Sequence, residues 1–433
     1  MIKAPTGTND ILPDRIPLWR YVEEHARKQC ALYGYREIRT PIFESTQLFV
    51  RSIGEVTDIV EKEMYTFQPK VERSDNPAKE NSRESFTLRP ELTAPVVRAY
   101  LEHHLDREQK SQKLFYLGPL FRHERPQKGR FRQFHQLGVE ALGFSNPLVD
   151  VEIINLAQSF LKTIGLDGCV LKINSIGCPE CRTGYRNVLR KYFAGHKDQL
   201  CANCRERLDR NVFRILDCKN KQCYEIAARA EPINNSLCAG CRTHFDAVLA
   251  GLEKNGLSYQ LDHHLVRGFD YYTRTIFEIT HSALGAQDAV GGGGRYDNLI
   301  AELGGSPAGA TGWALGLERI ILALEAVKNS NLIIQPDKLK VFVASVTQEL
   351  GSESFALVSE LRKKNIAADM DYEGRSLKAQ MRLANKQEVS YVIILGPEEL
   401  TKNAVKLKNM QSGQESEVQR DDLFDLFLKK NMI

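Results

Sequence analysis

The 433-residue sequence has no long apolar run, no strong excess of one charge and no apolar segment near its N-terminus. Its most apolar short stretch, Tyr391–Leu395, is far too short to span a bilayer. The opening MIKAPTGTND offers no hydrophobic core for a secretory signal. The net charge of +4 permits a polyanionic partner without requiring one. We therefore expect a cytoplasmic protein without a membrane part, divided into roughly two to four domains.

A P-loop is also missing, because GxxxxGK[ST] occurs nowhere in the chain. A phosphate site would have to come from the basic segment FRHERPQKGRFRQF at Phe121–Phe134. The flanking stretches Lys113–Phe121 and Phe134–Gly143 alternate as strands do, so we expect an antiparallel pair joined by a basic loop. Arginine forks match phosphate oxygens, although a solvated basic hairpin tip explains the charge equally well.

Three motifs in order resemble those of class II aminoacyl-tRNA synthetases. Phe121-Arg122-x-Glu124 resembles motif 2, Gly316-Leu317-Glu318-Arg319 resembles motif 3, and the stretch 33–57 around Pro41 resembles motif 1, the usual dimer element. The resemblance implies an ATP site with Mg²⁺ and a homodimer. It also implies that Arg122 binds the α-phosphate, Arg319 the γ-phosphate, and Glu124 and Phe134 the adenine.

Two further segments resemble the signatures peculiar to histidyl-tRNA synthetases: LVRGFDYYTRTIFE (Leu265–Glu278) and GGGGRYDNL (Gly291–Leu299). FTLRPELTAP, QFHQLGVEALG and the N-terminal GTND match the same family. The resemblance implies a ligase that converts L-histidine and ATP to histidyl-adenylate and transfers the histidyl group to the 3′ end of tRNA(His). The histidine-binding residues that it implies are Glu91, Thr93, Gln136, Glu140, Arg267, Tyr271, Tyr272 and Tyr296.

The chemistry of histidine fits this set of side chains. Its α-ammonium, carboxylate and imidazole need acidic and amide partners, and Gln136 and Glu140, four apart on a strand, share one face. We expect Arg267, with Arg122 and Arg319, to be catalytic, because a cation between two reacting anions offsets their repulsion. For the tyrosines the alternative is core packing. For Arg267 it is a surface ion pair with Asp270 in a strand-like region.

The four glycines Gly291–Gly294 allow two interpretations. Alone, the run could be a flexible linker. Beside Arg295-Tyr296-Asp297 it is more typical of a backbone that approaches a substrate closely.

Eight of the ten cysteines form four close pairs between 178 and 241. This spacing fits two structural zinc sites of four thiolates each, and reduced buried thiols are the alternative. The sequence leaves the pairing open. The candidate ligands are Cys178, Cys181, Cys201, Cys204, Cys218, Cys223, Cys238 and Cys241.

The expected fold is a class II synthetase core of α+β type, an antiparallel sheet with flanking helices. The core would comprise residues 1–172 and 259–330, with an inserted helical, cysteine-rich domain at 173–258. Residues 337–433 alternate strand and helix, which predicts a C-terminal α/β domain with a largely parallel sheet. The resemblance makes this domain the anticodon-binding domain. Local patterns predict a helix over 17–34 with Gly34 as its cap, a surface loop at 71–85 and a linker at 334–338.

Two rival functions remain open at this point. The first is a regulatory paralogue with the same fold, such as the synthetase-like subunit of a phosphoribosyltransferase, although such paralogues tend to lose the catalytic arginines and the C-terminal domain. The second is a zinc-dependent RNA-binding protein without catalysis. The retained Arg122, Arg267 and Arg319 and the C-terminal module disfavour the first rival, and the ordered ATP-site motifs disfavour the second.

Overall fold

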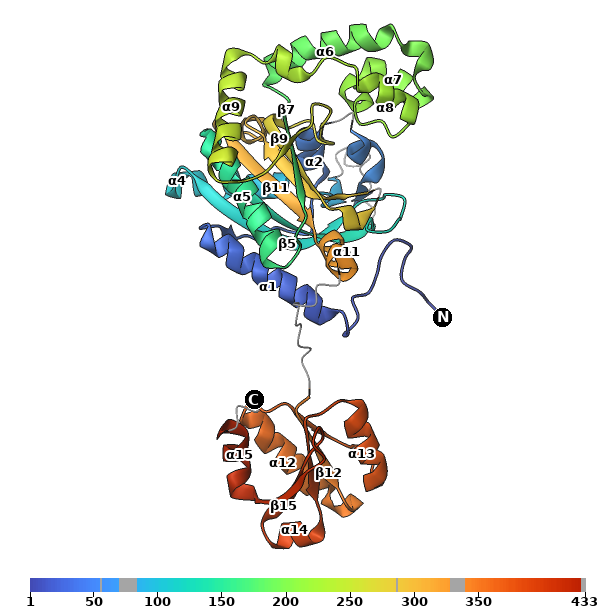
Figure 1. Ribbon diagram of the computed structural model, residues 1–433, viewed down its shortest axis with the longest axis vertical. Helices are drawn as coiled ribbons and strands as arrows, with labels where there is room; N and C mark the ends of the chain where they lie inside the picture. The colour runs from blue at the N-terminus through green and yellow to red at the C-terminus, as the bar shows by residue number, and fades with distance from the viewer. Residues whose placement is uncertain (55–56, 70–83, 286, 328–338, 430–433) are drawn as a thin grey trace, which may run out of the picture. The chain divides into compact units, whose positions relative to one another are not determined.

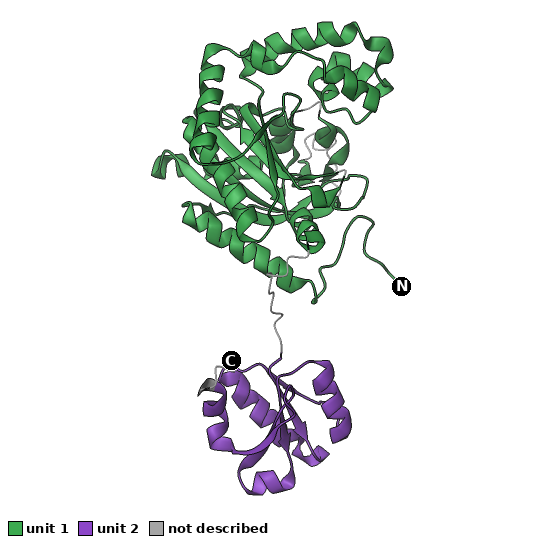
Figure 2. Ribbon diagram, viewed as in Figure 1, with its two compact units in different colours: residues 1–333 green, residues 334–433 purple. Residues whose placement is uncertain are grey.

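The computed structural model describes residues 1–54, 57–69, 84–285, 287–327 and 339–429. The chain divides into two compact units, Met1–Ile333 and Ile334–Ile433, which Figure 2 distinguishes by colour. Among the described residues, no helix combines the length and apolar character needed to cross a membrane. The predicted linker at 334–338 and most of the predicted loop at 71–85 lie outside the described residues.

An eight-stranded sheet forms the centre of the first unit (Figure 1). Its inner strands pair antiparallel, and β1 and β8 add parallel pairs at its two edges. The fold class expected from the sequence is therefore confirmed. In spatial order the strands are β1 (Arg36–Glu37), β5 (Gln112–Phe121), β6 (Gln133–Leu142), β11 (Ala310–Gly316), β10 (Ala289–Arg295), β9 (Thr273–Thr280), β7 (Val170–Ser175) and β8 (Gln260–Leu261).

Alternation along β6 divides the sheet into two faces. Leu137, Val139 and Ala141 are fully buried against the main helical layer, so the even-numbered residues between them point to the opposite face. The helical layer contains α1 (Ile16–Leu32), α5 (Pro147–Thr163), α9 (Ala239–Lys254) and α11 (Leu317–Val327).

Helix α1 matches its predicted pattern. It buries Trp19, Val22, Ala26 and Cys30 at helical spacing. At its end, Gly34 has φ +78° and donates its N–H to the carbonyl of Ala31 at 3.0 Å. The predicted helix and its glycine cap are confirmed.

The opposite face carries shorter elements. A small antiparallel sheet combines β2 (Phe43–Ser45), β4 (Phe86–Leu88) and β3 (Tyr65–Phe67). The helical elements on this face are α2 (Thr46–Ile53), the π-helix Ile59–Glu63, α3 (Thr93–Glu102), α4 (Leu105–Glu108) and α10 (Leu299–Glu302). The 3₁₀ turn Ser282–Leu284 instead packs against the main helical layer.

Residues between β7 and β8 form a helical segment, shown in green in Figure 1. Its hydrophobic side chains include Tyr185, Leu189 and Phe193, all buried. The segment contains α6 (Pro179–Ala194), α7 (Ala202–Arg210), α8 (Lys221–Ala227), α9 and the 3₁₀ turns Lys197–Gln199, Val212–Ile215 and Ile233–Ser236.

The second unit is a five-stranded sheet with helices. Strands β13 (Ala368–Met370), β12 (Val341–Ser345) and β14 (Tyr391–Leu395) are parallel, as expected. Strands β15 (Ala404–Asn409) and β16 (Glu415–Gln419) add an antiparallel hairpin, so the sheet is mixed. Its helices are α12 (Gly351–Lys363), α13 (Leu377–Lys386), α14 (Pro397–Thr401) and α15 (Arg420–Lys429), with a 3₁₀ turn at Gln348–Leu350.

One local prediction was wrong. The segment 259–265 was expected to be a strand, and Arg267 and Asp270 were expected inside a strand-like region. Only Gln260–Leu261 is strand, and residues 262–272 form a connection without regular secondary structure between β8 and β9. Asp262, Arg267 and Asp270 interrupt the apolar alternation in residues 262–272. This part of the chain therefore lacks the continuous pattern of a paired strand.

Candidate active site

A pocket of about 260 Å³ opens on the even-numbered face of β6. Four arginines and four glutamates are among the residues around it: Arg122, Arg130, Arg267, Arg319, Glu91, Glu124, Glu278 and Glu318. Of the residues predicted from the sequence, the lining also includes Thr93, Phe134, Gln136, Tyr271, Tyr272 and Tyr296. The structure thus brings together side chains that lie far apart along the chain.

Glu140 lies directly beneath this lining. Its Oε1 atom accepts hydrogen bonds from Thr93 Oγ1 at 2.7 Å and from the Tyr116 hydroxyl at 3.3 Å. Its Oε2 atom accepts a short hydrogen bond from the Tyr296 hydroxyl. Three side chains that border the pocket therefore converge on one buried carboxylate, and they fix its orientation.

Glu91 is held at the start of helix α3. Its two carboxylate oxygens accept the backbone N–H groups of Thr93 at 2.6 Å and Ala94 at 2.9 Å. Unpaired N–H groups at a helix start favour an anion at this position. Each carboxylate oxygen keeps a second lone pair for a ligand.

Burial raises the pKa of both carboxyl groups. The pKa of Glu91 rises to about 7, although the N–H groups of Ala94 and Thr93 oppose the shift. The pKa of Glu140 rises to about 8, opposed by the hydroxyls of Tyr296 and Thr93. Two adjacent carboxyl groups that titrate near neutral pH are typical of a functional site.

The aromatic wall comes from the irregular segment before β9. The Tyr271 ring stacks on Phe269, with centroids 5.2 Å apart, and meets Tyr296 edge-on at 5.7 Å. Tyr272 lies beside Tyr271 at 4.7 Å. The tyrosines are buried and also border the pocket. They therefore belong both to the apolar core and to the pocket wall.

A glycine on β11 makes room for Glu140. Gly312 pairs with Glu140 across the β6–β11 ladder. A Cβ atom at position 312 would overlap the Oε2 atom of Glu140. Only glycine leaves space for the carboxylate in its hydrogen-bonded position.

The four-glycine run is strand β10 and not a linker. Gly291 and Gly292 border the pocket. A Cβ atom at Gly292 would come within 3.0 Å of Arg267 Nη1 and overlap the backbone of Phe277. The expectation of a backbone close to the site fits this geometry.

Arg122 follows β5 at the other end of the pocket. Its Nε atom donates to the carbonyl of Pro90 at 2.9 Å. Its guanidinium lies over the rings of Phe134 at 5.4 Å and Phe269 at 5.6 Å. Glu124 lies 3.8 Å from Arg122 and 3.3 Å from Arg130, so acidic and basic groups alternate at this rim.

Arg319 extends from the start of α11 toward β10. Its Nη2 atom donates to the carbonyl of Gln287 at 3.1 Å, and Nη1 makes a short hydrogen bond to the carbonyl of Ala289. The preceding Glu318 accepts hydrogen bonds from the backbone N–H of His135 at 2.9 Å and from its Nδ1 atom at 2.9 Å. Glu318 and Arg319, in the segment resembling motif 3, therefore connect the start of α11 to β6 and β10.

Arg267 pairs with Glu278 and not with Asp270. Its Nη1 atom lies 3.2 Å from Glu278 Oε2. In the described part of the chain, the buried Nε atom of Arg267 finds no hydrogen-bond acceptor. The alternative of an Arg267–Asp270 surface pair is therefore wrong, and Arg267 keeps a donor for a ligand.

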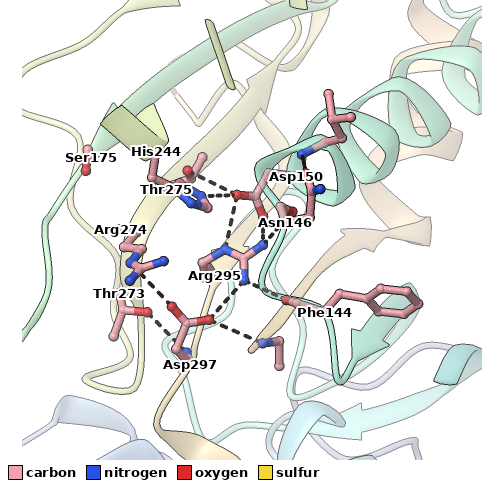
Figure 3. Close-up of polar contacts among 12 residues, drawn as sticks. Phe144, Asn146, Asp150, Ser175, His244, Thr273, Arg274, Thr275, Arg295 and Asp297 are labelled. Atoms are coloured by element: carbon pink, nitrogen blue, oxygen red, sulfur yellow. Dashed lines mark hydrogen bonds and ion pairs between the residues drawn. The ribbon is translucent and has the colours of Figure 1, made fainter. Parts of the chain in front are cut away.

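Arg295 and Asp297, from the same motif as Tyr296, point away from the pocket. Figure 3 shows Arg295 between Asp150 and Asp297. Its Nε atom lies 3.1 Å from Asp150 Oδ2, and its Nη1 atom lies 3.0 Å from Asp297 Oδ1. His244 Nε2 on α9 approaches Asp150 at 2.7 Å. This buried network joins β10 to α5 and α9, which is a structural role.

The eight cysteines lie apart from this pocket, and none of them belongs to its lining. Sequence reasoning missed Tyr116, Glu278 and Gly312. Tyr116 occupied a predicted strand and resembled a core residue. The available signal for Glu278 was its place as a single acidic residue in the apolar strand IFEIT.

Comparison with known proteins gives consistent matches. The family model for histidyl-tRNA synthetase matches residues 7–320, and the anticodon-binding domain model matches residues 340–430. A histidine–tRNA ligase of Desulforamulus reducens is 48% identical over 98% of this chain and 98% of its own length. The crystal structure of apo S. aureus histidyl-tRNA synthetase has a TM-score of 0.79 at 36% identity and covers 99% of this chain and 100% of that chain.

A third match concerns the fold alone. A Bacillus halodurans structure described as an ATP phosphoribosyltransferase regulatory subunit/histidyl-tRNA synthetase has a TM-score of 0.63 at 22% identity. It covers 92% of this chain and 98% of its own. The fold is thus common to proteins with different described activities.

Proposed function

The chain belongs to the histidyl-tRNA synthetase family, of class II, and on that premise we propose that its pocket activates L-histidine with ATP and transfers the histidyl group to the 3′ end of tRNA(His). It is a ligase, like the curated relatives that it matches along nearly its whole length.

The carboxylates at one end fit the amino-acid substrate. Glu91 offers a negative charge to the α-ammonium group, with Thr93 beside it. Glu140 and Tyr272 face the imidazole, while Tyr271 and Tyr296 form the wall. Gln136, on the same face of β6 as Glu140, fits a place beside the carboxylate of histidine.

The other end fits the nucleotide. Arg122 and Arg319 would contact the α- and γ-phosphates, and Phe134 and Glu124 the adenine. Carboxylate oxygens are the ligands that Mg²⁺ prefers, and Glu278 at the pocket offers them. When bound with ATP, Mg²⁺ supplies positive charge to the phosphate oxygens.

Arg267 lies on the pocket wall near both substrate ends. In the first step, a carboxylate oxygen of histidine attacks the α-phosphorus, and pyrophosphate leaves. A fixed guanidinium at this place stabilises the charge on both reacting anions. In the second step, a ribose hydroxyl of the tRNA end attacks the histidyl carbonyl, and AMP leaves.

The single observation that carries this proposal is the convergence of Glu91 and Glu140 with Arg122, Arg267 and Arg319 around one pocket. A regulatory paralogue does not need all three arginines. A non-catalytic RNA-binding protein needs none of the pocket.

The test is ATP–pyrophosphate exchange measured with each of the twenty amino acids. We expect exchange with histidine alone. Absence of histidine-dependent exchange, or equal exchange with several amino acids, would contradict the proposal.

The proposed partners follow from both units. The match at residues 340–430 supports contact of the second unit with the tRNA anticodon. Charge in that unit gives no further support, because Lys402, Lys406 and Lys408 each lie within 3.8 Å of a glutamate. We place the enzyme in the cytoplasm, where its substrate tRNA is used in protein synthesis.

A homodimer is also proposed. The segment resembling motif 1 carries exposed apolar side chains, with Ile42 47% and Phe43 49% exposed, and Leu32 directly before it is 77% exposed. Phe43 also contacts the exposed Phe67 edge-on at 5.8 Å. An exposed apolar group of this kind is typical of an interface. Sedimentation equilibrium at micromolar concentration should give twice the chain mass, and a monomer would contradict the proposal.

A further inference from the structure

The cysteines of residues 178–241 gather into two separate groups of four sulfur atoms. Within each group, all sulfurs lie within 4.8 Å of one another. The outer group is Cys178, Cys181, Cys238 and Cys241, and the inner group is Cys201, Cys204, Cys218 and Cys223. The pairing is nested, because the inner group lies within the segment that the outer group closes.

The sulfur–sulfur distances match metal coordination. Zn–S bonds of about 2.3 Å in a tetrahedron place sulfur atoms about 3.8 Å apart. The sulfurs of Cys178 and Cys181 are 3.6 Å apart, and those of Cys201 and Cys218 are 3.9 Å apart. A disulfide requires about 2.05 Å, so these are not disulfide geometries.

Backbone groups also point at the sulfurs. The N–H of Cys238 donates to Cys181 Sγ at 3.1 Å, and the N–H of Cys201 donates to Cys223 Sγ at 3.2 Å. Such bonds stabilise the thiolate that a metal requires. Apolar packing alone does not explain the groups, because Cys238 is exposed and Cys178 and Cys201 are half-buried.

We propose that the two groups are tetrathiolate Zn²⁺ centres with this nested pairing, and that the outer centre positions Arg182 to hold the Tyr271–Tyr272 segment of the amino-acid pocket. The second half rests on the proposed function, since it takes the pocket to bind histidine. The first half does not depend on any activity.

The link between the outer centre and the pocket is direct. Arg182 follows Cys181 in the sequence. Its Nη1 atom donates to the carbonyls of Asp270 at 3.0 Å and Tyr272 at 3.2 Å. Its guanidinium lies over the ring of Phe213 at 5.7 Å, and Phe213 belongs to the stretch between Cys204 and Cys218. Arg182, which binds the backbone of Asp270 and Tyr272, thus lies next to a ligand of the outer group in sequence and contacts a residue between two ligands of the inner group.

The residues just before Cys178 also bond to the backbone that follows Tyr272. Ile176 donates its N–H to the carbonyl of Arg274, and Arg274 donates its N–H to the carbonyl of Gly177, both at 2.8 Å. Gly177 has φ +66°, and a Cβ there would come within 2.5 Å of the Cys181 Cβ atom. The close turn into the centre therefore requires glycine.

A small helical segment gains stability from such centres. Metal staples are a usual addition in modules of this size. Zinc with four protein sulfurs has no open coordination position. Neither centre contributes to the pocket lining, so a structural role follows.

The metal test uses the full chain purified without chelator. Elemental analysis should give two zinc ions per chain, one for each group. Cys181→Ser/Cys241→Ser should keep one ion, and Cys181→Ser/Cys204→Ser should keep none. Under sequential pairing these two results are reversed. The control Cys30→Ser/Cys169→Ser should keep both ions, because these cysteines lie outside the groups.

A wild-type measurement covers the case in which a variant does not fold. Limited chelation should leave chains with one zinc, and alkylation followed by mass mapping should then protect cysteines in sets of four. The sets should be those of the nested pairing. Fewer than ~1.5 zinc per chain in wild type, against two closed sites, or protected sets that mix the two groups, would overturn the proposal.

The positioning role of Arg182 has its own test. Arg182→Ala should raise the KM for histidine in ATP–pyrophosphate exchange by roughly 10-fold, with the KM for ATP and the zinc content unchanged. Arg182→Lys should recover part of the loss. Arg186→Ala, which removes the same charge from an exposed place on α6, should have no effect.

The coupling of Arg182 to the outer centre is tested by combination. Adding Arg182→Ala to Cys181→Ser/Cys241→Ser should raise the KM for histidine no further than the cysteine change alone. Fully additive effects, or an equal rise in the KM for ATP, would remove the positioning role and leave the zinc centres standing. Absence of all exchange in wild type would instead count against the proposed function.

Discussion

The Nη1 atom of Arg267 lies 3.2 Å from the Oε2 atom of Glu278, and this contact holds the guanidinium against the pocket wall. The pair leaves the Nε atom of Arg267 without an acceptor in the described part of the chain. One side of the guanidinium is therefore fixed by the protein, and the other side keeps hydrogen-bonding capacity for an anion.

Arg267→Ala should lower kcat of histidine-dependent exchange by ~10²–10³-fold, the usual loss for one preorganised donor. The KM for ATP should change little, because Arg122 and Arg319 remain. Steady-state exchange kinetics measure both constants, and Arg229→Ala, at an exposed position, is the matched control. Wild-type exchange in the Arg267 variant would show that this residue has no catalytic role.

The pKa of about 7 for Glu91 predicts a pH dependence of histidine use. Below that pH, Glu91 in the free enzyme is protonated and cannot offer a charge to the α-ammonium, so kcat/KM for histidine should fall as the pH decreases from 8 to 6. Glu91→Gln should be poorly active and should lack this limb.

The imidazole of histidine titrates in the same range, so a histidine analogue with a triazole ring is the control. Its kcat/KM should still fall on the acid side. A flat profile for the analogue would mean that the substrate, and not Glu91, causes the decrease.

The pKa of about 8 for Glu140 predicts a cost in stability at high pH. The folded state binds this proton more tightly than the unfolded state, whose carboxyl has a pKa of about 4.3. The stabilising contribution is thus complete below about pH 4.3 and disappears as the pH rises through about 8. Urea unfolding of the ligand-free protein between pH 5 and pH 8.5 should show wild type losing stability relative to Glu140→Gln. Parallel profiles for the two proteins would contradict the assignment.

Gly312→Ala should disturb the amino-acid pocket, because the added Cβ overlaps the Glu140 carboxylate. The displaced carboxylate loses its bonds to Thr93 and Tyr296. We expect the KM for histidine to rise by roughly 10-fold or more, with the KM for ATP nearly constant. Gly184→Ala on α6, where a Cβ meets no atom within 4 Å, should behave as wild type; an unchanged KM in the Gly312 variant would show that the site relaxes freely.

Asp150→Asn should destabilise the first unit by about 3–5 kcal/mol, the usual result of leaving a buried charge without its partner. Burial raises the pKa of Asp150, but the hydrogen bond from His244 and the charge of Arg295 outweigh burial and hold it below its ordinary value. The contribution is therefore present above the unfolded pKa of about 3.9 and is lost as the pH falls. Urea unfolding measures the change, with the exposed Asp246→Asn as control. A loss within about 0.5 kcal/mol, as for a surface change, would mean that the network does not stabilise the fold.

Local patterns predicted much of the fold. The spacing of Trp19, Val22, Ala26 and Cys30 gave helix α1, and the alternation around 113–121 and 134–143 gave the β5–β6 pair, because in both cases one face is buried. The segment at 259–265 was misassigned over most of its length, since an alternating pattern does not reveal whether a neighbouring strand is available for pairing.

The pocket residues were named mainly from resemblance, and the structure places most of them around one cavity. The grouping of cysteines could not be predicted, since spacing along the chain does not say which pairs meet across a nested segment. The partner of Arg267 was missed for the same reason. Glu278 is eleven residues away along the chain, and the sequence does not show how the irregular residues 262–272 bring Arg267 beside it.

The outer cysteine group also shows that residues 178–241 leave and rejoin the rest of the first unit at nearly the same point, because the sulfurs of Cys178 and Cys241 lie within 4.8 Å of each other. The segment is topologically a side branch, and no strand of the eight-stranded sheet lies within it. A short turn between positions 177 and 242 could therefore replace it without changing the order of the strands. Such a replacement would remove the donor to the carbonyls of Asp270 and Tyr272, together with apolar side chains that share one buried cluster with Tyr271 and Tyr272.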